Sequence, residues 1–316
     1  MTASELFDYY RTTGALTEED CLDYISWVQD APDVTKSAMA VSGLTLSLLE
    51  NNWDRRKVEL LATSANSSLT TGMVTERAII GLLLVMIQYD TEVRTDQTLT
   101  DALQESLLSN PELSFSALCA ITRTTQVKGV EEYNKSMAKE LQPLLSEQPS
   151  EKLYDVFQHH QQEIERITRL HLDQNFSFFK DAYQTPFFRE RAANWFIPWS
   201  DTALQNINED DREHVQKLLK VWIMCDSDKY ALGSMYSMLR STLQERIPLD
   251  GLTSNKREDV PVDGYVQQMY RFFRLSSFTQ AKPFDIVTQL REKVVYRWVV
   301  VGRQAQEAIS ELLQGV

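Results

Sequence analysis

Five side chains between positions 159 and 171 are of the types that bind metals. They are His159, His160, Glu163, Glu165 and His171. Imidazole and carboxylate groups are ligands for zinc and iron. The apolar residues around them recur at helical spacing, which predicts one long helix from Glu151 to Asn175. On that helix His160 and His171 would lie about 16 Å apart along the axis, so they could not share an ion.

A dinuclear metal site in a helical bundle would need a matching Glu-x-x-His motif on a second helix. The sequence offers no such motif. We therefore expect no metal and no cofactor, and interpret these histidines as packing or surface residues.

Asp226 and Asp228 resemble the start of a calcium-binding loop. The glycine that such a loop needs is displaced to Gly233, and no acidic residue closes the loop. A helix beginning near Asp226, with acidic residues in its first turn, explains the segment better.

Three cysteines, Cys21, Cys119 and Cys225, are too few and too far apart for a disulfide framework or a zinc motif. The first fourteen residues have neither a basic segment nor an apolar segment of a secretory signal. The longest apolar run, Ala78–Ile87, is shorter than the roughly 20 residues that cross a bilayer. We expect a cytoplasmic protein without a membrane span.

The net charge of −13 and the pI near 4.9 disfavour binding to nucleic acid or to anionic lipid. Residues 256–303 differ from the rest of the chain. They contain nine Lys and Arg but only five Asp and Glu, which gives a local charge of +4. This basic segment could contact a partner or the protein's own acidic half.

Large aromatic side chains are concentrated from Phe176 to Trp199. Such rings each bring roughly 150–250 Å² of surface that neighbours must cover. An exposed platform of Trp195, Phe196 and Trp199 could stack on sugars or peptides, but their place between apolar helices favours burial. The candidate binding residues are these three together with Arg271 and Arg274.

Glycine and proline are scarce, and apolar residues recur every three or four positions, so the chain is predicted to be all-α. Thr17 is a predicted N-cap of a helix that ends before Pro32. Further helices are predicted at Val34–Leu49, Asp54–Ala65, Met73–Tyr89 and Asp96–Leu108 and after Pro111, with apolar and amphipathic helices alternating.

Three apolar helices share a weak repeat. The segments starting at Ala40, Ala78 and Ala117 align at spacings of 38 and 39 residues, which is typical of HEAT, armadillo or tetratricopeptide-like helix pairs in an α-α superhelix. Gly43, Gly81 and Ala120 occupy one shared position, where a small residue would let neighbouring helices approach closely.

The predicted organisation is a helical-repeat region, residues 1–148, followed by a less regular helical region, residues 149–316. The second region contains the aromatic junction 176–199 and an irregular loop, 247–263. The apolar helices of the first region would form a concave binding face. Its predicted solvent-facing polar residues are Thr45, Ser47, Thr75, Glu76, Gln88 and Arg123. Whether a partner or the chain's own basic segment covers this face is left open.

Three sequence blocks carry a resemblance to a known family. They are Asn194–Trp199 (NWFIPW), Cys225–Tyr230 (CDSDKY) and Tyr265–Phe273 (YVQQMYRFF). In this order they resemble segments of large uncharacterised Bacteroidetes proteins, where such blocks precede tetratricopeptide repeats. The resemblance spans roughly residues 1–280 and implies a bacterial helical-repeat protein, but the family has no known activity. The sequence departs from it after Phe284, where no tetratricopeptide consensus follows.

No phosphate-binding glycine loop, G-x-S-x-G elbow or H-E-x-x-H motif occurs. The leading hypothesis is a non-enzymatic scaffold that binds a protein partner, with the oligomeric state open. The alternative is a metal-dependent hydrolase at the 159–228 junction. It would use His159, His160, Glu163 or His171 with Asp226 or Asp228.

Overall fold

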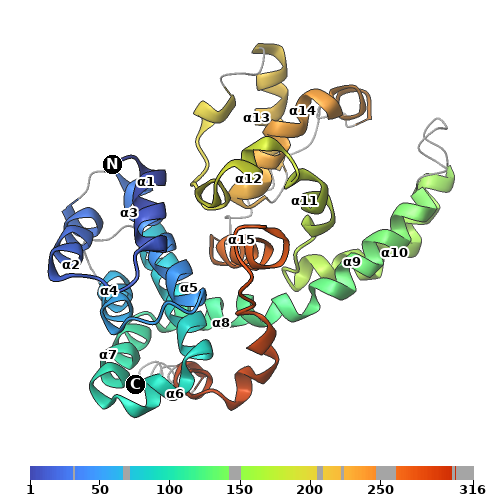
Figure 1. The fold of residues 1–316 in the computed structure, drawn as a ribbon. Coiled ribbons are helices and arrows are strands. Elements are labelled where there is room, and N and C mark those ends of the chain that lie inside the picture. The colour runs from blue at the N-terminus through green and yellow to red at the C-terminus, as the bar shows by residue number, and fades with distance from the viewer. Residues whose placement is uncertain are drawn as a thin grey trace, which may run out of the picture.

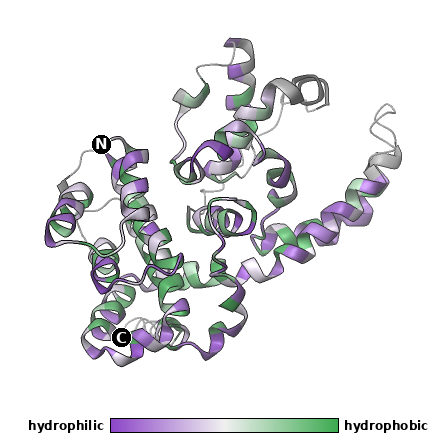
Figure 2. Cartoon of the chain, in the orientation of Figure 1, coloured by the Kyte–Doolittle hydropathy of each residue, from purple (hydrophilic) through white to green (hydrophobic). Residues whose placement is uncertain are grey.

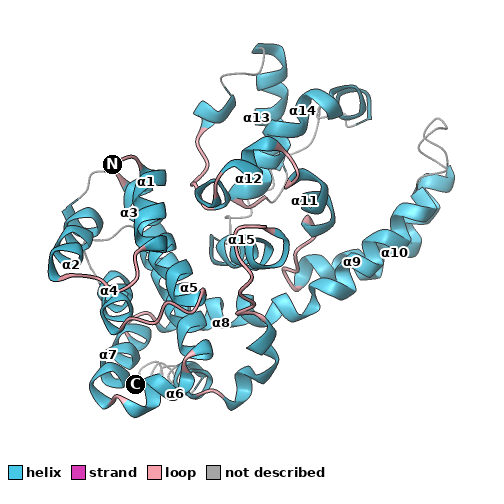
Figure 3. Cartoon of the chain, in the orientation of Figure 1, coloured by secondary structure: helices cyan, strands magenta, loops and turns pink. Residues whose placement is uncertain are grey.

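The computed structural model describes residues 1–30, 33–66, 72–141, 151–204, 209–221, 224–246, 261–300 and 303. Within these ranges the regular structure is helical and no strand occurs, as predicted (Figure 3). The first half contains α1 (Ala3–Thr12), α2 (Glu18–Ile25), α3 (Val34–Leu49), α4 (Arg55–Asn66), α5 (Gly72–Gln88), α6 (Asp90–Thr95), α7 (Gln97–Leu108) and α8 (Pro111–Arg123). Short irregular helical turns follow α2 and α8, η1 (Ser26–Asp30) and η2 (Thr124–Gln126).

Side-chain caps begin the first helices. The Thr17 hydroxyl accepts a hydrogen bond from the Asp20 amide, and the Asp20 carboxylate accepts one from the Thr17 amide. The predicted N-cap is therefore confirmed as half of a capping box. Asp33 caps α3 by accepting from the amides of Thr35 and Lys36. Each cap satisfies amides that the helix itself leaves unpaired.

The first-half helices stack side by side. α3 packs between α1 and α5, and α5 also packs on α8. α4 packs on α5 and α7. Nearly every residue of α3 and α5 is buried, and both helices are mostly apolar beyond their first two turns (Figure 2).

Two glycines permit the close approach of these helices. A Cβ on Gly43 would lie 2.3 Å from the Phe7 carbonyl oxygen of α1, and a Cβ on Gly81 would lie 2.5 Å from Thr45 Oγ1 of α3. Each glycine therefore meets the residue thirty-six positions before it, on the preceding helix of the stack.

Several hydrogen bonds between helices in this half join residues 39 to 41 positions apart. Arg11 pairs with Glu50 over 39 residues, the Tyr24 and Ser64 hydroxyls pair over 40, and the Tyr89 hydroxyl donates to the Leu48 carbonyl over 41. These bonds join α1 to the end of α3, α2 to α4, and the end of α5 to α3.

The second half begins with two helices that project from the body as an arm, α9 (Val127–Leu141) and α10 (Glu151–Arg169) (Figure 1). Next come α11 (Phe176–Ala182), α12 (Pro186–Glu190), η4 (Ala192–Trp195), η5 (Asp201–Leu204), α13 (Glu209–Val221), α14 (Asp226–Arg246), α15 (Pro261–Leu275) and η6 (Asp285–Glu292). Residues 294–300 are also helical.

The helix predicted from Glu151 to Asn175 ends earlier, at Arg169, because His171 adopts a left-handed backbone with φ of 52°. The Leu172 amide donates to the Ile167 carbonyl and the His171 amide to the Thr168 carbonyl, the pairing of a Schellman C-cap. Leu172 and Ile167 also pack together with Val130.

We define the inner face of the first half as the side built by α3, α5 and α8, which was predicted to be the concave binding face. Elements of the second half pack on this side. α15 packs on α5 and α8, and η4 packs on α1. Arg77 of α5 donates to the Phe196 carbonyl oxygen at 2.9 Å, and the Tyr265 hydroxyl donates to Ser42 at 3.0 Å. The prediction that Thr45 and Ser47 face solvent is wrong, since other helices of the first half bury both completely. Thr45 lies against Gly81 of α5, and Ser47 accepts a hydrogen bond from Lys57 of α4.

The other four predicted polar residues of this face, Thr75, Glu76, Gln88 and Arg123, are half-buried. Arg123 forms an ion pair with Asp263 of α15, so the second half of the chain contacts this face at that point. Of the predicted loop 247–263, residues 247–260 lie outside the described residues, and 261–263 form the first turn of α15. None of the described helices is long and apolar enough to cross a membrane.

Candidate functional site

The most strongly charged cluster in the interior surrounds Arg271 of α15. Its guanidinium donates to both Asp173 oxygens at 2.8 and 2.5 Å, and to Asp228 Oδ1 at 2.6 Å. Asp173 follows the C-cap of α10, and Asp228 lies in the first turn of α14. Three elements are thereby joined at one point, and the exposed fraction of Arg271 is 0%.

Burial raises the pKa of Asp173, and the charge of Arg271 opposes that rise. For Arg271, burial alone would lower the pKa, but the two carboxylates outweigh it and hold the pKa well above its ordinary value. The cluster is a structural ion-pair network, because its cation is fully occupied by protein acceptors.

Cys225 lies against this network. Its thiol donates to Asp228 Oδ2 at 3.3 Å, and burial, with the negative charge of Asp228, raises the pKa of the thiol to about 12. A cysteine reacts as its thiolate. At neutral pH this side chain therefore stays protonated and is not an activated nucleophile.

A small pocket lies beside the network, between η2, α15 and the end of α10. Its charged lining residues are Arg123, His171, Asp173 and Asp263. Asp263 accepts from Arg123 at 2.6 Å and lies 3.4 Å from His171 Nδ1. Burial raises the pKa of Asp263, and Arg123 opposes the rise. The pocket has room for a water molecule or a small ion rather than for an organic substrate.

The five predicted binding residues are placed differently from one another. Trp195 and Phe196 are buried, and the Trp195 indole donates to the Phe188 carbonyl at 2.9 Å. Arg271 is the buried cation described above. Trp199 is half-buried against Tyr230, and Arg274 is exposed. Trp195 and Phe196 are covered on all sides by the core, as their position between apolar helices favoured, so they form no surface platform.

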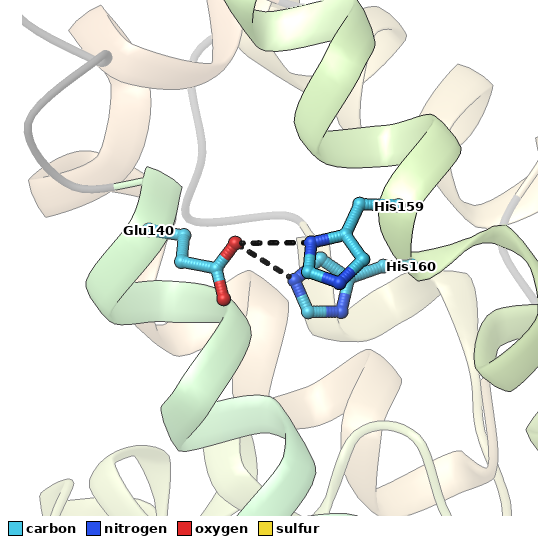
Figure 4. Close-up of side chains that lie close together, drawn as sticks. All are labelled: Glu140, His159 and His160. Carbon is cyan, nitrogen blue, oxygen red and sulfur yellow. Dashed lines mark ion pairs between the residues drawn. The ribbon is translucent and has the colours of Figure 1, made fainter.

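A cluster with metal-ligand chemistry lies on the arm. Glu140, near the end of α9, lies opposite His159 and His160 of α10 (Figure 4). Glu140 Oε2 is 3.3 Å from His160 Nε2 and 3.7 Å from His159 Nδ1. The ligand atoms of the three residues all lie within 4.8 Å of one another.

Glu140 was not among the predicted metal ligands. A dinuclear site would need a Glu-x-x-His motif on the second helix, whereas the neighbouring helix supplies a single glutamate. The signal that could have found it is the amphipathic pattern of the two segments that form α9 and α10, because amphipathic helices that follow one another in the chain often pack side by side.

The residues of the alternative enzyme hypothesis lie in separate places. His159 and His160 face Glu140, whereas Glu163 pairs with Arg166. His171 faces Asp263, Asp228 is bound to Arg271, and Asp226 is 3.5 Å from Lys229. They do not converge on one site.

Comparison of the chain with protein-family models, with curated proteins and with solved structures finds no match. The resemblance to Bacteroidetes helical proteins therefore stays a prediction.

Proposed function

We propose that this protein is a non-enzymatic helical scaffold that binds a basic protein partner on its outer acidic face. We define that face as the exposed side of α2, α4 and α7. The observation that carries the proposal is the covering of the inner face by α15 and η4. In the described part of the chain, α2, α4 and α7 on the opposite side of the stack keep exposed side chains for a partner (Figure 1).

Two features support a HEAT-, armadillo- or tetratricopeptide-like arrangement of the first half. Inter-helix hydrogen bonds recur at separations of 39 to 41 residues. Gly43 and Gly81 meet the preceding helix at equivalent positions. Such stacks are rigid along their length and present extended surfaces to partners.

The charge of the outer acidic face indicates the kind of partner. Its exposed charged residues are six acids, Glu18, Glu19, Asp23, Glu59, Asp101 and Glu105, and two bases, Arg55 and Arg56. Arg55 is already paired with Glu59 and Asp96. The negative field that remains attracts Lys- and Arg-rich segments.

An apolar contact point lies among these acids. Leu22 of α2 has an exposed fraction of 64%, and Glu18, Glu19 and Asp23 are its exposed neighbours on the same helix. A basic segment that carries an apolar side chain would match both features.

Charge reversal tests the proposal. Glu18→Lys/Glu19→Lys/Asp23→Lys should abolish capture of the partner by the immobilised protein, and capture by the parent should weaken as salt rises. The matched control reverses three exposed acids of the arm, Glu132→Lys/Asp155→Lys/Glu165→Lys, and should retain capture. Equal capture by both variants would contradict the proposed face.

A further inference from the structure

We propose that Glu140, His159 and His160 form a binding site for Zn²⁺ that joins the two helices of the arm. The three side chains come from both helices and turn toward one another (Figure 4). The proposal does not depend on the outer acidic face, which lies on other helices.

The spacing of the ligand atoms suits a tetrahedral ion. Zinc binds imidazole nitrogen at about 2.0–2.1 Å and carboxylate oxygen at about 2.0–2.2 Å, so neighbouring ligand atoms lie roughly 3.3–3.5 Å apart. The distances from Glu140 Oε2 to His160 Nε2 and His159 Nδ1 are 3.3 and 3.7 Å. The ligand nitrogens of His159 and His160 lie within 4.8 Å of one another. The His159 side chain is 74% exposed, so its ring can turn to bring its nitrogen closer to the other two ligand atoms.

His160 is the independent observation that points to a ligand. The residue is 8% exposed, and its Nε2 makes no hydrogen bond within the described part of the chain. Glu140 Oε2 lies 3.3 Å from this nitrogen but does not accept a hydrogen bond from it. A buried imidazole nitrogen without a hydrogen bond calls for a partner, and a metal ion bound between it and the nearby carboxylate would supply one.

The His160 ring is held in place before any ion binds. Tyr133 of α9 packs against it edge-on at 5.3 Å between ring centroids, and the Tyr133 hydroxyl donates to the His160 carbonyl oxygen. Metal sites depend on such support around their ligands, because it fixes ring orientation.

The donor set selects the ion. Two imidazole nitrogens and one carboxylate oxygen suit Zn²⁺, with water in the fourth position, whereas Mg²⁺ and Ca²⁺ prefer oxygen ligands throughout. The exposure of Glu140 and His159 gives that water access. Among the described side chains, Val130, Ile167 and Leu172 form a hydrophobic cluster at the base of the arm. Zinc would join α9 to α10 farther along the arm.

Calorimetric titration of the metal-free 316-residue chain with Zn²⁺ tests the site. The parent should bind one ion per chain, and Glu140→Gln and His159→Ala should each weaken binding at least tenfold. Both residues are exposed, so neither change should affect folding. Glu132→Gln and His171→Asn are the matched controls and should bind like the parent. All variants keep the three cysteines, so thiol-bound zinc would be common to them.

Hydrogen exchange gives a second readout. Zinc should slow amide exchange in α9 and α10 of the parent and the controls, and should leave exchange in Glu140→Gln unchanged. If the parent binds no zinc, or if Glu140→Gln and His159→Ala bind it as tightly as the parent, the three residues form an ion pair only and the proposal is wrong.

Discussion

The guanidinium of Arg271 is completely buried, and its charge is balanced by Asp173 and Asp228 from two other elements. A buried ion pair contributes little net stability compared with a hydrophobic substitute. Removing one partner is different, because it leaves uncompensated charge in the interior.

We predict that Arg271→Met lowers the free energy of unfolding by about 3–5 kcal/mol at pH 7. Denaturant titration measures this loss. Arg274→Met is the matched control, because Arg274 is an exposed arginine on the same helix, and it should change stability by about 0.5 kcal/mol or less. Similar losses in the two variants would contradict the ion-pair role.

The loss should also depend on pH. Burial raises the pKa of Asp173, and Arg271 opposes the rise. Without that arginine, the pKa of Asp173 in the folded state moves further above its unfolded value of about 3.9. The folded variant then holds a proton that the unfolded chain has released, and its stability falls as pH rises through that interval. The difference from the parent should therefore shrink from pH 7 toward pH 4. A constant difference would exclude this linkage.

At the scale of helices, Gly81 sets the distance between α5 and α3. We predict that Gly81→Ala destabilises the protein by roughly 1–3 kcal/mol, because the added Cβ would lie 2.5 Å from Thr45 Oγ1. Thermal or denaturant unfolding measures the change, and Thr45→Ala in the same chain should recover part of it by opening the space.

Gly129→Ala is the control for this substitution. Gly129 lies in α9 with nothing within 4 Å of an added Cβ, so alanine there should stabilise by about 0.4–1 kcal/mol. If both substitutions stabilise the protein, the close packing of α5 on α3 does not require a glycine at position 81.

Several helices were predictable from local pattern alone. α3 has the predicted bounds, and α4, α5 and α7 begin and end within a residue of theirs, because apolar periodicity and caps are local signals. Residues whose surroundings come from distant segments were not predictable in the same way. Ser47 accepts a hydrogen bond from Lys57 of α4, and Arg271 pairs with carboxylates of two distant segments. Glu140 lies beside His160 because α9 and α10 pack together.

At the scale of the whole molecule, one hydrophobic core runs through both halves. It joins α3 and α5 to Trp195, Phe196 and Phe272, and continues to Val287 and Leu290 of η6. We predict a single cooperative thermal transition, with equal calorimetric and van't Hoff enthalpies. Two separate transitions would show instead that residues 1–148 and 149–316 unfold as independent domains.

Arg77 also imposes an order of events during synthesis. Its buried guanidinium bonds to Ser42, which is already made, and to the Phe196 carbonyl, which lies 119 residues downstream. At roughly 5–20 residues per second, the ribosome adds that stretch in about 6–24 seconds. Through this interval the apolar side of the nascent stack has no cover of its own. The time taken to translate the arm and the aromatic segment therefore sets how long the apolar side of the nascent first half is exposed to aggregation.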